Sequence, residues 1–71
     1  MKYDPNLTGH ENLARFGYCA PRSVAGSYRR KIETVDGRKV GEMNAPIARA
    51  WMIAGCPLTS DGLADLDAVT L

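Results

Sequence analysis

The sequence has few of the residues that build catalytic and metal centres. It contains one histidine, His10, and two cysteines, Cys19 and Cys56, without the Cys-x-x-Cys or His-x-x-x-His spacing of zinc sites. Neither cysteine lies in a context typical of a nucleophile with its base. We therefore expect no enzyme, no bound metal and no cofactor. The sequence leaves open whether the two thiols and the imidazole converge in space.

Long hydrophobic runs are also missing. The longest apolar run, residues 50–54, is far shorter than the ~20 residues that cross a bilayer. Residues 1–5 lack the apolar segment of a secretory signal peptide, and a small secreted domain usually carries more cysteines. These absences predict a cytoplasmic protein with reduced thiols and no membrane association.

What is present is the composition of one small globular domain, residues 1–71, with 45% hydrophobic and 24% charged residues. A domain of this size buries only about 60% of its unfolded surface and is marginally stable alone. Residues 1–40 carry eight basic and four acidic side chains, whereas residues 41–71 carry one basic and four acidic. This asymmetry favours a binding protein with one cationic face, monomeric when free.

The N-terminal part predicts a short helix. Thr8-Gly9-His10-Glu11 is a capping box, so we expect a helix over residues 9–16 that buries Leu13 and Phe16 and stops at Gly17. A strand is an open possibility in the irregular stretch that follows, between residues 18 and 26.

Asp36-Gly37 predicts a β-hairpin, for which two registers compete. A two-residue turn sets Ile32 opposite Gly41 and Glu33 opposite Val40, so neither apolar side chain has an apolar partner across the strands. We prefer a three-residue loop, residues 35–37, with the opposite pairs Ile32–Val40, Glu33–Lys39 and Arg30–Glu42. The expected core face carries Tyr28, Ile32 and Val40, and the expected solvent face carries Arg29, Lys31, Glu33 and Lys39.

Two further helices are predicted. Asn44 caps the first, which has Pro46 in its first turn, ends at Gly55 and carries an apolar stripe formed by Ile47, Ala50, Trp51 and Ala54. It is apolar nearly all round, so we expect it to be buried on more than one side. Thr59 or Ser60 caps a last short helix over residues 60–68 that buries Leu63 and Leu66. The predicted class is α+β: a short N-terminal helix, a central antiparallel hairpin with two or three strands, a buried helix and a short C-terminal helix.

The candidate binding site is the basic hairpin. Clustered cations are what phosphate groups or an acidic protein surface require. The alternative is a merely solvated hairpin whose charges protect an edge strand from aggregation, and nearby acidic residues dilute the patch. The predicted site residues are Arg22, Arg29, Arg30, Lys31, Arg38 and Lys39.

Two other interpretations are weaker. A DNA-binding helix-turn-helix over Ala45–Leu66 would present Asp61, Asp65 and Asp67 to phosphate, which repels them. Trp51 is a candidate interface anchor, but a single tryptophan in a domain this small more often forms the centre of the core.

The basic hairpin between short helices resembles, in size and charge layout, small lytic-phage regulators that bind bacterial RNA polymerase, inhibit initiation and promote antitermination. The resemblance implies a protein of the host cytoplasm that modulates transcription by binding a large host complex, plausibly RNA polymerase, with nucleic-acid contact within that complex. The alternatives are a stand-alone nucleic-acid-binding module and a phage inhibitor of another host complex, such as an anti-CRISPR.

Overall fold

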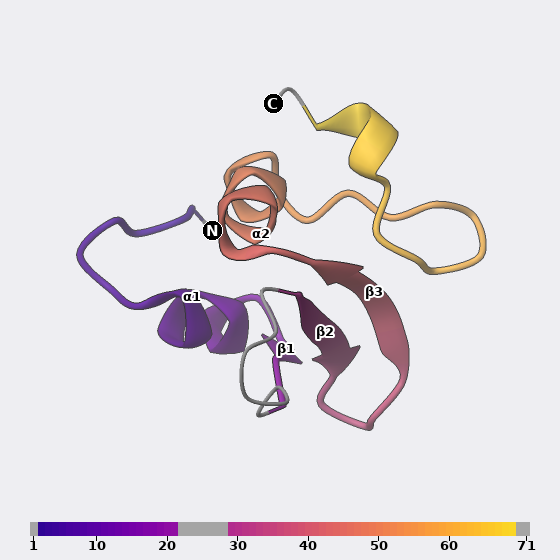
Figure 1. Ribbon diagram of the computed structural model, residues 1–71, viewed down its shortest axis with the longest axis horizontal. Coiled ribbons are helices and arrows are strands. Elements are labelled where there is room, and N and C mark those ends of the chain that lie inside the picture. The colour runs from indigo at the N-terminus through magenta and orange to yellow at the C-terminus, as the bar shows by residue number, and fades with distance from the viewer. Residues whose placement is uncertain (1, 22–28, 70–71) are drawn as a thin grey trace.

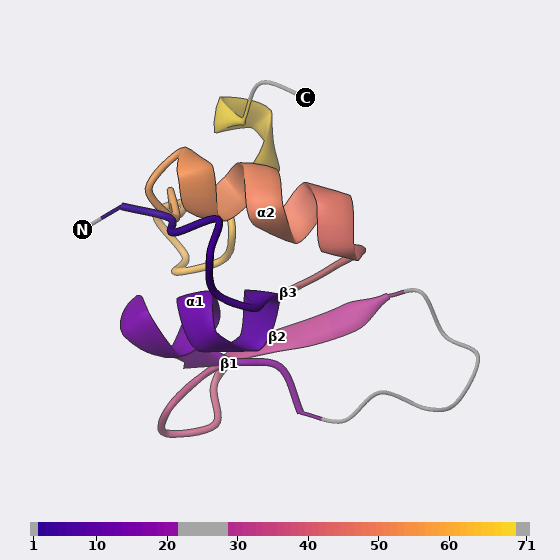
Figure 2. The same ribbon diagram turned by 90° about the vertical axis from the view of Figure 1, so that its left-hand side faces the viewer.

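The computed structural model describes residues 2–21 and 29–69. Its elements are, in order, α1 (Gly9–Arg15), β1 (Tyr18–Cys19), β2 (Arg30–Thr34), β3 (Lys39–Met43), α2 (Ala45–Ile53) and a 3-10 helix η1 (Leu66–Ala68). The strands form an antiparallel sheet in the order β1-β2-β3. α2 lies over one face of the sheet, and α1 lies beside β1 (Figures 1 and 2). The predicted α+β class is confirmed, with the third strand present.

The capping box predicted for α1 is present. The Thr8 hydroxyl accepts a hydrogen bond from the Glu11 N–H at 3.1 Å, and the Glu11 carboxylate accepts from the Thr8 N–H at 2.9 Å. These hydrogen bonds lower the pKa of Glu11. Leu13 is buried as predicted, whereas Phe16 is only half-buried. The chain leaves the helix at Gly17, which has a φ of 89°.

The hairpin turn follows the three-residue-loop prediction. The Thr34 N–H donates to the Arg38 carbonyl at 2.9 Å, and the Gly37 N–H donates to the Thr34 carbonyl at 2.9 Å. Gly37 has a φ of 91°, a conformation that costs an L side chain about 1–2 kcal/mol. The glycine of the Asp-Gly pair therefore determines where the chain reverses.

Beyond the turn, the register changes by one residue. The observed opposite pairs, from the turn outward, are Glu33–Lys39, Ile32–Gly41, Lys31–Glu42 and Arg30–Met43. Only the first agrees with the preferred register, and the predicted pairs Ile32–Val40 and Arg30–Glu42 are wrong. Val40 is the extra residue of a β-bulge.

The bulge has a physical reason in the burial of β3. In a regular strand, residues three apart lie on opposite faces, but the bulge brings such pairs onto the same face. Val40 and Met43 are both buried in the core. Lys39 and Glu42 both lie on the other face, where Nζ and Oε1 are 3.8 Å apart. Burying a side chain such as valine or methionine contributes about 1.5–3 kcal/mol, which favours the bulged register.

The bulge also receives the C-terminal segment. The Ala64 N–H donates to the Val40 carbonyl at 2.9 Å. A Cβ atom placed on Gly41 would lie 3.4 Å from the Ala64 Cβ, so the glycine leaves room for this contact. Residues of the C-terminal segment thereby cover part of the outer edge of β3.

The predicted start of α2 is confirmed, but its buried face differs from the prediction. Asn44 Oδ1 accepts from the Ile47 N–H at 2.9 Å. The buried residues are Ala48, Trp51 and Met52, whereas Ile53 is 62% exposed. Of the predicted stripe, only Trp51 is buried, Ile47 and Ala50 are half-buried, and Ala54 is exposed. The helix packs over the sheet and against α1, whereas the side that carries Arg49 and Ile53 is exposed, so the predicted burial on more than one side is confirmed only in part.

The predicted C-terminal helix over residues 60–68 is also wrong. Residues 59–63 form a second tight turn, in which the Thr59 N–H donates to the Leu63 carbonyl at 2.7 Å, and only η1 is helical. Leu63 is 46% exposed and Leu66 is half-buried. The Thr59 hydroxyl accepts from the Leu63 N–H at 3.3 Å, so it stabilises a turn instead of capping a helix.

Trp51 is the centre of the core, as expected. Its side chain is fully buried, and its indole N–H donates to the Pro57 carbonyl at 2.8 Å. The ring of Tyr18 packs against it, with centroids 5.2 Å apart and an interplanar angle of 60°. The tryptophan thus joins α2 to β1 and to the segment that follows α2.

Candidate functional site

The outer face of the hairpin, opposite Ile32 and Val40, carries charges of both signs. Lys31 lies opposite Glu42, and Glu33 lies opposite Lys39. Both lysines are exposed, whereas both glutamates are half-buried. Opposite charges on facing strands favour this pairing by roughly 0.2–1 kcal/mol each. The hairpin therefore presents exposed lysines side by side with less exposed glutamates on the same face.

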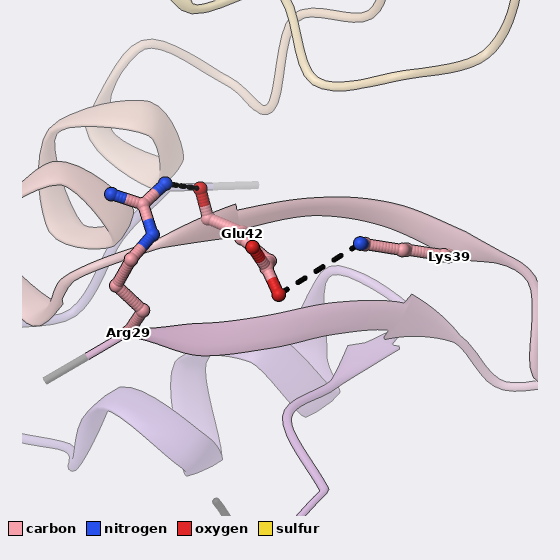
Figure 3. Close-up of polar contacts among 3 residues, drawn as sticks. All are labelled: Arg29, Lys39 and Glu42. Atoms are coloured by element: carbon pink, nitrogen blue, oxygen red, sulfur yellow. Dashed lines mark hydrogen bonds and ion pairs between the residues drawn. The ribbon is translucent and has the colours of Figure 1, made fainter. Parts of the chain in front are cut away.

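Glu42 lies between two of the predicted cations (Figure 3). Its backbone carbonyl accepts a hydrogen bond from the Arg29 guanidinium at 2.8 Å, and its carboxylate lies 3.8 Å from Lys39 Nζ. Arg29 therefore ties the start of β2 to β3. The Lys39–Glu42 ion pair is exposed, so it contributes at most about 1 kcal/mol.

The remaining predicted site residues are distributed over the hairpin. Lys31 and Arg38 are exposed, and neither side chain has a hydrogen-bond or ion-pair partner among the described residues. Arg30 is half-buried on the core-facing side of β2, next to Ile32 in the alternation. Arg22 lies outside the described residues, as does Tyr28 of the expected core face. We call Arg29, Lys31, Arg38 and Lys39, with Glu33 and Glu42, the hairpin surface; Arg38 lies at its turn end, where its Nη1 approaches Gly62, and Arg30 points to the other side of β2.

Arg30 instead lines a cleft of about 400 Å³ between the two helices and β2. The base of the cleft is formed by buried apolar side chains, and its rim includes a second arginine, Arg49, from α2. We call it the arginine cleft. Its lining residues are Tyr3, Gly9, His10, Leu13, Arg30, Ile32, Ala45, Pro46, Ala48, Arg49 and Met52. None of these is acidic.

The thiols and the histidine do not form a common centre. His10 lines the arginine cleft from α1, whereas Cys19 is exposed on β1 and Cys56 is buried after α2. Burial raises the pKa of the Cys56 thiol to about 11, so it is protonated and weakly nucleophilic near neutral pH. Within residues 2–21 and 29–69, no group of three or more His, Cys, Asp or Glu side chains is placed to hold a metal ion.

Asn12 is a structural residue that the sequence did not reveal. It is fully buried in α1, and its side-chain amide binds both the N–H and the carbonyl of Asp4, each at 2.8 Å. It also donates to the Thr8 carbonyl at 3.0 Å. Asn12 therefore holds the N-terminal segment against α1 and places Tyr3 at the cleft. An asparagine on the inner face of a capped helix was the available signal.

Neither α1 nor α2, the α-helices of the described part of the chain, has the length and hydrophobicity needed to cross a membrane. Comparison with family models, curated proteins and solved structures finds no match for this chain. The hairpin surface and the arginine cleft are therefore the features that bear on its function.

Proposed function

We propose that the protein is a non-enzymatic regulator that binds a large macromolecular complex through its hairpin surface, with bacterial RNA polymerase as the candidate partner. One observation carries this proposal: Lys31, Arg38 and Lys39 are exposed cations of a single hairpin, and among the described residues the side chains of Lys31 and Arg38 form no hydrogen bond or ion pair, although Asp36 lies near enough to Arg38 to interact with its charge. Exposed charges of this kind guide a complementary surface into register and raise its association rate.

The charge pattern favours an acidic protein surface over nucleic acid. Glu33 and Glu42 lie on the same face as Lys31 and Lys39, so a phosphate backbone that meets this face also meets carboxylates. A protein surface can place its own basic groups opposite those carboxylates, whereas a nucleic acid cannot. The hairpin surface therefore supports recognition of a protein with mixed but mainly acidic charge.

The placement of the nucleophilic side chains supports binding rather than catalysis. Of the described residues that line the arginine cleft, His10 and Tyr3 could act in acid–base catalysis, and none is a cysteine, serine or carboxylate nucleophile. The choice of RNA polymerase as candidate partner rests on the resemblance to lytic-phage regulators in size and charge layout.

The test uses immobilised protein and purified bacterial RNA polymerase, with binding measured by surface plasmon resonance. The double variant Lys31→Gln/Arg38→Gln removes two exposed cations from the hairpin surface. Its matched control, Lys2→Gln/Arg15→Gln, removes one exposed lysine and one exposed arginine elsewhere. We expect the hairpin variant to bind about tenfold more weakly and the control to bind like the unmodified protein.

Equal binding by the two variants would refute the hairpin surface as the site. Absence of binding to RNA polymerase, together with retention of a different purified host complex, would reject RNA polymerase and favour the inhibitor alternative. Binding to duplex DNA alone, with log K falling against log salt at a slope near −2.7 for about three neutralised phosphates, would favour the nucleic-acid module instead.

A further inference from the structure

We propose that the arginine cleft is a binding site for a small amphipathic anion, with a carboxylate or phosphate head and an apolar body. The site is distinct from the hairpin surface, because Arg30 points to the core-facing side of β2 and Lys31 to the other. The proposal therefore does not depend on the identity of any macromolecular partner.

The electrostatics of the cleft select an anion. Arg30 comes from β2 and Arg49 from α2, yet both line the same cleft, and neither has a hydrogen-bond or ion-pair partner among the described residues. His10 lies on the same lining and adds a further nitrogen donor. Guanidinium groups bind carboxylate and phosphate oxygens through parallel N–H donors. Two such groups beside a lining without acidic residues leave a positive charge that an oxyanion would neutralise.

The base of the cleft selects an apolar body. Leu13, Ile32 and Met52 are buried core residues, and each contributes to the lining. Ligand sites commonly combine such an apolar lining with a few polar groups that determine orientation. A volume of about 400 Å³ corresponds to that of roughly 13 water molecules in the liquid, so it accommodates a body of about ten non-hydrogen atoms.

The shape of the site also separates this ligand from simple ions. Arg30 is half-buried and lies two residues from the fully buried Ile32 on the core-facing side of β2, so a cation and the apolar base line the same cleft. An inorganic anion would satisfy the arginines but leave the apolar base in contact with water. An eight-carbon chain with a terminal oxyanion would contact both, and its apolar burial would add to the charge-assisted hydrogen bonds.

The experiment titrates the ¹⁵N-labelled full chain with four probes: octanoate, octyl phosphate, 1-octanol and inorganic phosphate. Dissociation constants come from the fitted amide shifts. We expect saturable binding of octanoate and octyl phosphate, with the largest shifts at Gly9, Leu13 and Ala48. Loss of the charge-assisted contacts should make 1-octanol at least tenfold weaker, and loss of apolar burial should make inorganic phosphate weaker still. The first two probes also show which head group the cleft prefers.

The variants Arg30→Gln and Arg49→Gln should each weaken octanoate binding about tenfold, and the double variant should abolish it. Arg38→Gln, an exposed arginine of the hairpin outside the lining, is the control and should bind like the unmodified protein. Equal affinity for 1-octanol and octanoate would overturn the proposal, as would unchanged binding by the double variant, shifts centred away from the cleft, or no saturable binding of either octyl anion. The comparison of probes uses the unmodified protein, so it decides the question even if a variant fails to fold.

Discussion

Two loops of this chain share the pattern Thr-x-Asp-Gly and the same backbone geometry. Residues 34–38 and 59–63 each close with a hydrogen bond from the threonine N–H to the carbonyl of the fifth residue, at 2.9 and 2.7 Å. In each loop the glycine N–H donates to the threonine carbonyl, and the glycine has a positive φ, 91° at Gly37 and 82° at Gly62. The turn geometry is thus a local property of four residues.

The two loops differ in what their flanks become. The first joins two five-residue strands, whereas the second joins only the single bridge Leu58–Ala64. The first is flanked by Ile32 and Val40, which the core buries, while Pro57 precedes the second and lacks the N–H that a longer ladder needs. The turn therefore sets the point of reversal, and buried side chains decide whether strands extend from it.

The largest expected effect comes from truncating the flank of each loop. Ile32→Ala should lower the free energy of unfolding by about 2–5 kcal/mol, because it leaves a cavity in the core. Leu58→Ala, at a side chain already 45% exposed, should cost less than about 1 kcal/mol. Urea denaturation followed by tryptophan fluorescence measures both. If Ile32→Ala does not fold, Ile32→Val should still lose about 0.5–1.5 kcal/mol. Similar losses for the two alanine variants would contradict the contrast drawn between the flanks.

The next effect concerns the turns themselves. Gly37→Ala and Gly62→Ala both place an L side chain at positive φ, so each should cost about 1–2 kcal/mol locally. Native-state hydrogen exchange should show the amides of β2 and β3 less protected in Gly37→Ala, and only residues near 58–64 affected in Gly62→Ala. Loss of protection throughout the sheet in Gly62→Ala would show that the second turn also supports the strands.

A smaller effect is expected for the charges that only the first hairpin carries. A double-mutant cycle with Lys39→Ala and Glu42→Ala should give a coupling energy of about 0.2–1 kcal/mol, because the ion pair is exposed. Chemical denaturation by urea at 0.05 and 1 M NaCl should show the coupling disappear at the higher salt concentration. A coupling that salt leaves unchanged would point to packing rather than charge.

The smallest effect is a pH dependence within the first turn. The Thr34 hydroxyl donates to the Asp36 carboxylate, which lowers the pKa of Asp36 from its ordinary 3.8. A carboxyl whose pKa is lower in the folded state stabilises the fold above its unfolded pKa, and this contribution is lost as the pH falls through the folded pKa. NMR titration should therefore place the Asp36 midpoint below 3.8, and Thr34→Val should move it upward. A midpoint that Thr34→Val leaves unchanged would remove the hydroxyl as the cause.

The helix starts and the first turn were predictable because they depend on residues within a few positions of one another. Thr8 with Glu11, Asn44 with Ile47, and Gly37 at the turn all act through local hydrogen bonds or a single dihedral angle. The second Thr-x-Asp-Gly turn was equally visible, but Thr59 and Ser60 also match a helix cap, and that interpretation was wrong. The repeated pattern was the signal that distinguished the two.

The bulge and the buried face of α2 were harder to predict. A glycine within a strand, such as Gly41, often marks a β-bulge. The position of this bulge, at Val40, became clear only because Val40 and Met43 are both buried in the same core. The arginine cleft had no signal in the sequence, because Arg30 and Arg49 line the same cleft only after α2 is placed over the sheet.

The caps of α1 and α2, the glycine of the first turn, the α+β class and the core position of Trp51 could be inferred from the chain alone, since they depend on short-range hydrogen bonding and hydrophobic content. The folded chain was needed to show which face of α2 is buried, that Val40 is the bulged residue, and that the predicted cations divide between the hairpin surface and the cleft. Those outcomes depend on which side chains from separate parts of the sequence pack together in the interior, and spacing along the sequence does not specify this.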